Sequence, residues 1–238
     1  MEPNHFLSST ERSLLIARHD FYVDEVRVRV LMQFKHIVPD PGRSARGQVE
    51  QRDSTTGWPS EADEADDEVP HFSEHRWLLL EGLKKQVLLG ALAGCYHNWE
   101  RDLAYLLGRK GLDGFQDCVD AVATEVSAGD TIGVFHLLER HFDWSVKSEP
   151  FFPDLDAARL IVNVYRRTAV GEVDELYRKY PRYIRSGPAD LGTKVIAAPN
   201  DEERLQISEA DFLWLAASLR AFWRAFPNSV ASSGTKLP

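Results

Sequence analysis

The fold is decided by a long apolar stretch in the first half of the chain, LLLEGLKKQVLLGALAGCYHNWERDLAYLL (residues 78–107). Its large apolar residues recur every three or four positions, the spacing of one face of an α-helix. Ser73 is a suitable N-cap before the stretch, and two glycines follow its end. We therefore expect a helix from about residue 73 to 107. Small residues in its middle, from Gly90 to Gly94, would let a second helix approach closely.

Another long helix is predicted before this stretch, from about residue 9 to 37. Ser8 and Glu11 match a capping box, and apolar residues follow at roughly helical spacing. The alternating valines at 26–30 also fit a strand, but the uninterrupted pattern before them favours a helix. Between the two helices, residues 39–70 are polar, acidic and poor in aliphatic side chains, so burial cannot offset the entropy of ordering them. They predict a disordered acidic insertion.

Shorter helices are predicted after the central stretch, at 113–128, 130–142, 154–168 and 173–180. Residues 193–198 fit a lone strand. A final helix begins after Ser208, which pairs with Asp211 as a cap, and residues 229–238 form a loose tail. The apolar face of that last helix is strongly aromatic and comprises Phe212, Leu215, Leu219, Phe222, Trp223 and Phe226. The sequence therefore predicts one all-α domain over residues 1–238, a helical bundle with two long helices and several shorter ones.

The composition places the chain among globular proteins. It has 238 residues, of which 43% are hydrophobic and 27% charged, and a net charge of −9. This charge gives no general attraction to nucleic acid or anionic lipid, so RNA binding would need a local basic patch. Charged side chains interrupt the apolar run at 77–99, which therefore falls short of a membrane span, and the first ten residues do not resemble a secretory signal. We expect a cytoplasmic protein without membrane contact.

Metal and cofactor sites are not predicted. Cys95 and Cys118 lack metal-ligand spacing and read as buried free thiols in a reducing compartment. His136 and His141 stand five residues apart on one predicted helix and do not share a face. The common nucleotide, metalloprotease and hydrolase motifs are absent.

The first polar cluster is His97-Asn98-Trp99-Glu100-Arg101-Asp102, on a helix that is otherwise apolar. If His97 or Glu100 faced a cleft, either could act as a general acid or base, and these two are the candidate catalytic residues. The alternative is that they satisfy polar groups within the bundle or lie at its edge.

A second cluster lies on the helix predicted at 154–168. Arg159, Asn163 and Arg166 stand at i, i+4 and i+7, on one stripe, with Arg167 beside it. Guanidinium groups match phosphate oxygens in bidentate fashion, so this stripe is the candidate RNA- or phosphate-binding site. The alternative is that these residues pair with carboxylates, among them Glu100, Asp102, Glu172, Asp174 and Glu175.

The order of these motifs resembles the HEPN-like superfamily of bacterial helical proteins. The resemblance covers roughly residues 75–227 and rests on Tyr96 to Glu100, the Arg-Leu-x-x-Asn of 159–163, the Glu-Leu helix ending at Pro181, and the aromatic last helix. It implies a helical bundle, often dimeric, among ribonuclease toxins, defence proteins and RNA-processing factors.

Active members of that superfamily carry an Arg, four to six residues, and then a His on the later helix. Here Asn163 matches the Asn that commonly follows the Arg, but Val162 replaces the Arg and Arg167 replaces the His. The resemblance therefore implies a degenerate catalytic motif. Arg12 with His19, and Arg29 with His36, fit the spacing but lie on the first helix, where a cleft facing Arg18–His19 or His36 is a minor alternative.

Three hypotheses follow. The leading one is a HEPN-like protein that acts by binding RNA or a partner protein, in bacterial defence or a toxin–antitoxin setting. The second is a metal-independent ribonuclease with a displaced base, His97 or Glu100, and arginines that stabilise the transition-state charge. The third is a structural or oligomerisation module, such as a homodimer, which exposure of Trp214, Trp223 or Phe226 would favour.

Overall fold

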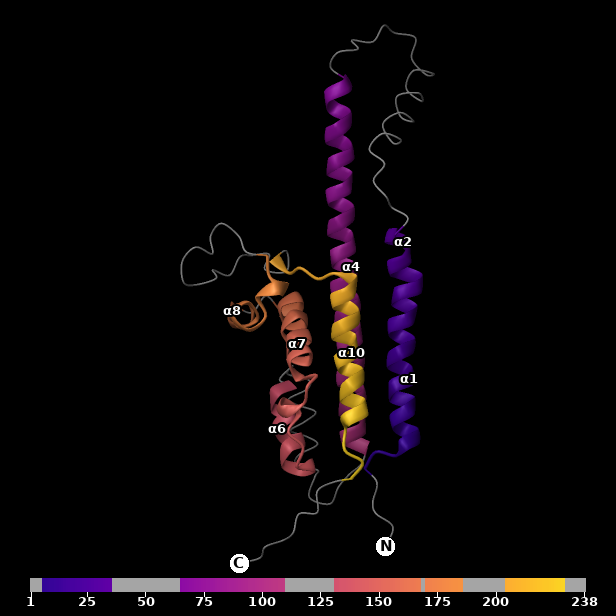
Figure 1. The fold of residues 1–238 in the computed structure, drawn as a ribbon, viewed down its shortest axis with the longest axis vertical. Coiled ribbons are helices and arrows are strands. Elements are labelled where there is room, and N and C mark those ends of the chain that lie inside the picture. The colour runs from indigo at the N-terminus through magenta and orange to yellow at the C-terminus, as the bar shows by residue number, and fades with distance from the viewer. Residues whose placement is uncertain (1–5, 36–64, 110–130, 168–169, 186–203, 230–238) are drawn as a thin grey trace, which may run out of the picture. The chain divides into compact units, whose positions relative to one another are not determined.

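The computed structural model describes residues 6–35, 65–109, 131–167, 170–185 and 204–229 (Figure 1). Within these ranges the regular elements are helices, and the β-structure amounts to isolated bridging, such as that between Ile184 and Leu205. The all-α prediction is confirmed. The predicted helix at 113–128, Cys118, the lone strand at 193–198 and the tail from residue 230 onward lie outside the described residues.

The first long helix is made of three consecutive segments. These are α1 (Ser9–Glu25), the π-helix η1 (Val26–Leu31) and α2 (Met32–Lys35). The alternating valines thus form a π-helical segment and not a strand. At the start of α1, the Ser8 hydroxyl accepts the Glu11 N–H at 3.2 Å and the Glu11 carboxylate accepts the Ser8 N–H at 3.0 Å, which confirms the predicted capping box.

The central helix α4 spans Ala65–Arg109 and begins eight residues before Ser73. It therefore includes the last part of the segment predicted as a disordered insertion at 39–70, whose remainder lies outside the described residues. The acidic composition of 39–70, which is poor in aliphatic side chains, had indicated disorder.

The later elements follow in the predicted order. They are α6 (Thr131–Phe142), η2 (Val146–Ser148), α7 (Phe152–Arg167), α8 (Val170–Lys179), η3 (Pro181–Tyr183) and α10 (Glu209–Ala225). The predicted Ser208–Asp211 capping box at the start of α10 is confirmed. In the described ranges, none of the helices combines the length and the apolar character that crossing a membrane requires.

The chain groups into two compact units, and α4 runs through both. One unit comprises Met1–Glu25 and Leu88–Pro238, and the other comprises Val26–Val87. In the first unit, α10 packs against α1 and α7, and α7 packs against α8 (Figure 1). In the second unit Leu31 is buried, whereas several large apolar side chains are exposed, including Val28, Trp77, Leu78, Leu79 and Leu83.

An aromatic cluster forms the core of the first unit. All six residues of the aromatic face predicted for α10 are buried. Phe222 packs edge-on against Trp99 of α4, with ring centroids 4.9 Å apart, and also contacts Trp144 and Phe226 at 5.3 and 5.7 Å. Such pairs contribute about 0.5–1.5 kcal/mol each beyond their buried area. This cluster holds α4 and α10 in the positions that create the sites described next.

Candidate functional site

Arg159 and Asn163, the first two residues of the predicted binding stripe, lie buried between α7 and α8. Arg159 is 6% exposed and Asn163 is 5% exposed. The Arg159 guanidinium donates from Nε and an η nitrogen to Asp156 Oδ1, at 3.0 and 2.8 Å. Asn163 donates to Glu172 Oε1 at 2.7 Å. Both side chains therefore have partners within the chain, although Asp156 was not among the carboxylates considered from the sequence.

Asp156 is the centre of this buried cluster. Its other oxygen, Oδ2, accepts from Lys179 Nζ and from Tyr180 Oη, each at 3.1 Å, and Lys179 also pairs with Glu175 at 2.6 Å. Burial alone would raise the pKa of Asp156, but the hydrogen bonds and positive charges of Arg159 and Lys179 outweigh burial and lower it. The carboxylate stays charged, and the cluster joins α7 to α8.

The other two residues of the stripe differ in position. Arg166 is exposed on α7, and the Arg167 side chain lies outside the described residues. The described part of the stripe is therefore divided between a buried half, Arg159 and Asn163, and an exposed Arg166. Its phosphate-binding role remains a prediction.

His97 and Glu100, the candidate catalytic residues, contact each other on α4. His97 Nδ1 lies 3.0 Å from Glu100 Oε2, and the two side chains are 37% and 10% exposed. Their i, i+3 spacing places them on neighbouring turns of one helix face. The structure thus brings this pair together, while its catalytic role remains a prediction.

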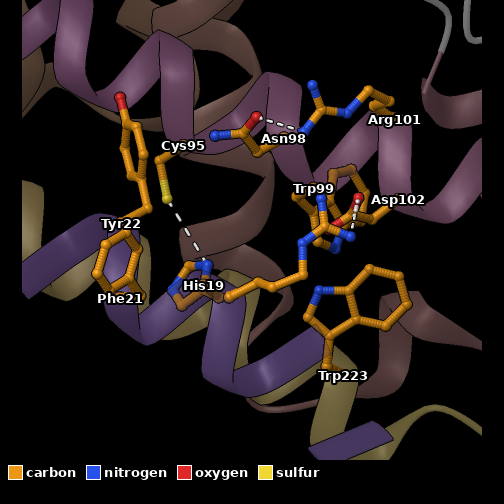
Figure 2. Close-up of a pocket in the computed structure, with 10 residues that line it drawn as sticks. His19, Phe21, Tyr22, Cys95, Asn98, Trp99, Arg101, Asp102 and Trp223 are labelled. Atoms are coloured by element: carbon orange, nitrogen blue, oxygen red, sulfur yellow. Dashed lines mark hydrogen bonds and ion pairs between the residues drawn. The ribbon is translucent and has the colours of Figure 1, made fainter. Parts of the chain in front are cut away.

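A separate cavity of about 200 Å³ opens between α1 and α4, with Trp223 of α10 at one side (Figure 2). Helix α1 contributes Arg18, His19 and Tyr22, and α4 contributes Asn98, Arg101 and Asp102. Among the described residues that line it, neither His97 nor Arg166 appears. The cavity is therefore distinct from both sites predicted from the sequence.

Both arginines of the cavity are held by acceptors on α4. Arg18 forms an ion pair with Asp102 at 3.1 Å. Arg101 donates to Asn98 Oδ1 at 2.9 Å (Figure 2). The Asp102 side chain is 11% exposed, whereas that of Arg18 is 51% exposed. Burial raises the pKa of Asp102, and the charges of Arg18 and Arg101 partly counteract this shift. Both guanidinium groups therefore act on the same carboxylate.

His19 joins three helices at the inner end of the cavity. Its Nδ1 lies 3.7 Å from Cys95 Sγ of α4, and its ring is hydrogen-bonded to the backbone of Ala216 in α10. Burial lowers the pKa of His19, and burial raises the pKa of the Cys95 thiol to about 12. The imidazole and the thiol are therefore both neutral at pH 7. This confirms Cys95 as a buried free thiol.

Sequence reasoning gave only part of this cavity. The first polar cluster included Asn98, Arg101 and Asp102, but only His97 and Glu100 were chosen from it as candidate catalytic residues. Arg18–His19 was a minor alternative, and Tyr22 was not assigned to a site. One usable signal was the run of small residues from Gly90 to Gly94. It allows α1 to approach so closely that the Tyr22 hydroxyl donates to the Ala91 carbonyl at 3.1 Å and would overlap a Cβ atom at Gly94.

No family model, curated protein or solved structure matches this chain. Within the described residues, His, Cys, Asp and Glu side chains do not gather in any group of three or more that could hold a metal ion. The functional argument therefore rests on the chain's own geometry.

Proposed function

We propose that this chain is a HEPN-like helical protein that acts by binding a partner protein through the outer face of α1. The observation that carries the proposal is an exposed apolar stripe on that helix. Leu14 is 60% exposed and Phe21 is 67% exposed, and seven residues, or about two helical turns, separate them. Large apolar side chains on one helix stripe are typical of surfaces that dock a partner helix or groove.

The packing of α1 supports this proposal. None of its 17 residues is buried, although helices in proteins draw most of their stability from packing an apolar face. Leu15, Ile16 and Tyr22 are half-buried, and polar contacts add to their packing. Arg12 donates to main-chain carbonyls at the end of α10, including Phe226 O at 2.5 Å, and Asp20 pairs with Arg220 at 2.8 Å. A partner covering the outer face of α1 would add to this incomplete apolar burial.

A partner protein is favoured over RNA for two reasons. First, the net charge of −9 opposes RNA binding except at a local basic patch. Second, the arginine stripe of α7, which was the candidate for such a patch, has Arg159 and Asn163 buried in pairs with carboxylate groups. Trp214 on α10, which is 62% exposed, offers a further apolar contact, whereas Trp223 and Phe226 are buried in the core.

The test compares the stripe with an equally exposed residue elsewhere. Proteins captured from nuclease-treated extract of the source cells are identified and purified, and their dissociation constants are then measured by calorimetry. We expect a Leu14→Gln, Phe21→Gln variant to bind at least about tenfold more weakly, since central apolar contacts dominate interface energetics. Tyr105→Gln is the matched control, because Tyr105 is 66% exposed on α4. Equal binding by the wild type and the Leu14→Gln, Phe21→Gln variant would refute the proposal. So would proteins that are captured from untreated extract but not from nuclease-treated extract.

The second candidate is a metal-independent ribonuclease, and the contact between His97 and Glu100 is the observation that favours it. A carboxylate at Nδ1 orients an imidazole, and the His97 ring is partly exposed to a substrate. The test is cleavage of an end-labelled RNA pool by purified protein in EDTA. Cutting that is lost in His97→Gln and kept in His136→Gln, an exposed histidine of α6, would support it. Intact RNA at micromolar protein concentration would argue against it.

A further inference from the structure

The cavity between α1 and α4 has the composition of a binding site for a small anion. Its polar lining on facing helices includes two guanidinium groups, from Arg18 and Arg101, and a single carboxylate, from Asp102, while His19 is neutral. These three charged groups carry a net charge of +1, in a protein whose total charge is −9. The cavity is therefore a small positively charged site on a negatively charged protein. It favours a ligand with one anionic group, because the rest of the protein repels a polyanion.

Both guanidinium groups are positioned before any ligand arrives. Asp102 of α4 pairs with Arg18. Asn98 of α4 accepts a hydrogen bond from Arg101 (Figure 2). A guanidinium has five N–H donors in a planar fork, so one such contact leaves others to receive an oxyanion in bidentate geometry. Anchored side chains lose less conformational freedom on binding, which increases affinity.

The rest of the cavity lining favours a ligand that contains an aromatic ring. Tyr22 and the exposed Phe21 provide aromatic surface, and the buried Trp99 and Trp223 border the cavity behind them. In addition, the Trp99 indole Nε1 is buried without a hydrogen-bond acceptor among the described residues, although buried polar groups are nearly always paired. An oxygen atom of a bound molecule is the kind of group that satisfies such a donor.

The cavity volume favours a small molecule. About 200 Å³ exceeds the space that one water or one inorganic phosphate needs, but it lies below the roughly 300–1,000 Å³ of pockets for drug-sized ligands. A single planar ring with one attached anionic group suits both the volume and the mixed aromatic and cationic lining.

We propose that the α1–α4 cavity binds a small aromatic anion, a planar ring bearing one phosphate or carboxylate group, between the Arg18 and Arg101 guanidinium groups. This site differs from the partner-binding stripe, although Phe21 borders both, because its ligand enters the cavity and requires the arginines, whereas the stripe also requires Leu14, which does not line the cavity. Binding of small probes to the purified chain can therefore succeed or fail whatever the outcome for the partner protein.

The experiment is calorimetric titration of the full chain with four probes: phenyl phosphate, benzoate, inorganic phosphate and the neutral benzyl alcohol. We expect phenyl phosphate or benzoate to bind with a Kd of about 1 mM or below, and the better of the two identifies the anionic group. Inorganic phosphate and benzyl alcohol should each bind at least about tenfold more weakly, because each lacks half of the recognised structure. If neither aromatic anion binds at 10 mM, or if benzyl alcohol binds as well as the anions, the proposal is overturned.

Two variants place the binding in this cavity. Arg101→Gln should weaken the better probe about tenfold, whereas Arg178→Gln, on the exposed last turn of α8, should leave it unchanged. Asp102→Asn should strengthen binding several-fold, because it removes the negative charge that opposes the ligand and keeps an oxygen to hold Arg18. A gain of affinity cannot result from damage to the fold. Unchanged affinity in both Arg101→Gln and Asp102→Asn would refute the assignment.

Discussion

Two regions of the first unit each contain an ion pair between an arginine and an aspartate, and the two pairs differ in solvent exposure. Between α7 and α8, Arg159 and Asp156 are 6% and 2% exposed, and Lys179 and Tyr180 complete the carboxylate's hydrogen bonds. Between α1 and α4, Asp102 is almost as buried, but the Arg18 side chain is 51% exposed. The first arrangement is closed, and the second keeps hydrogen-bond donors accessible.

This difference separates a group that stabilises the fold from a group that can bind a ligand. A buried guanidinium whose donors are taken up by carboxylates contributes to the packing of two helices and cannot reach a substrate. A half-exposed guanidinium anchored at one end is positioned and still accessible. The comparison predicts that variants in the closed cluster act mainly on stability, whereas variants in the cavity act mainly on binding.

The largest effect is expected at the closed cluster. Asp156→Ala would leave the Arg159 guanidinium buried without its main counterion, and breaking a buried ion pair in this way costs about 3–5 kcal/mol. For a chain of this size, each kcal/mol lowers the melting temperature by about 2–4 °C. Denaturant unfolding of the wild type and the variant, followed by circular dichroism, measures the loss.

The matched control for this variant is Asp102→Ala, which removes the almost equally buried aspartate of the open cavity. Its partner Arg18 can turn to water, so we expect a loss of stability below about 1 kcal/mol. Equal destabilisation by Asp156→Ala and Asp102→Ala would show that exposure of the arginine does not distinguish the two regions, and the comparison would fail.

A smaller effect is expected where α1 meets α4, the contact that forms the cavity. A Cβ atom at Gly94 would overlap the Tyr22 hydroxyl, so Gly94→Ala should displace that ring and break its hydrogen bond to Ala91. Overpacking of this kind costs about 1–3 kcal/mol, partly offset by up to about 1 kcal/mol of helix propensity gained from alanine. The same unfolding measurement reports the net loss.

Gly82 provides the control within the same helix. A Cβ atom there meets nothing within 4 Å, so Gly82→Ala should stabilise the chain by up to about 1 kcal/mol. Tyr22→Phe in the Gly94→Ala background removes the overlapping oxygen and should recover part of the lost stability. If Gly94→Ala were as stabilising as Gly82→Ala, α1 would not pack against α4 through Tyr22.

Local patterns in the sequence predict much of this fold because they report short-range physics. Both capping boxes need only residues three positions apart, and the aromatic face of α10 needs only helical spacing. The start of α4 was predicted eight residues late, because an acidic composition indicates disorder but also suits the first turn of a helix. The π-helical form of Val26–Leu31 had no local signal that we can identify.

The sites were harder to predict because they depend on burial and on long-range contacts. Arg159, Asn163 and Arg166 share a stripe by spacing, but spacing does not reveal that the first two are buried against carboxylates while the third is exposed. Arg18 and Asp102 are 84 positions apart in the sequence, and the residues around each of them carry no pattern that predicts their contact. Helical periodicity predicts which residues share a face of a helix, whereas the tertiary fold determines which other helix that face contacts.

The smallest effect concerns pH and the inner end of the cavity. Burial lowers the pKa of His19 below its value of 6.5 in the unfolded chain, so the folded state favours the neutral ring. The unfolded chain then binds more protons, and the stability that His19 contributes is full above pH 6.5 and declines as the pH falls below it. His141 acts in the same direction, because burial also lowers its pKa. We therefore expect the denaturation midpoint to decrease as the pH is lowered from 7.5 to 5.5.

The His19→Gln variant isolates the part due to the cavity. Glutamine retains a donor for the Ala216 backbone but does not titrate, so the decline between pH 7.5 and 5.5 should be smaller than in the wild type. Asp102, whose pKa is raised by burial, changes stability in the opposite direction at lower pH, but it is present in both proteins and cancels in the comparison. Identical slopes for the wild type and His19→Gln would mean that His19 is not protonated differently in the folded and unfolded states. The junction of α1, α4 and α10 would then be open to water, and the cavity would lack the closed inner end that distinguishes it from the exposed surface of α1.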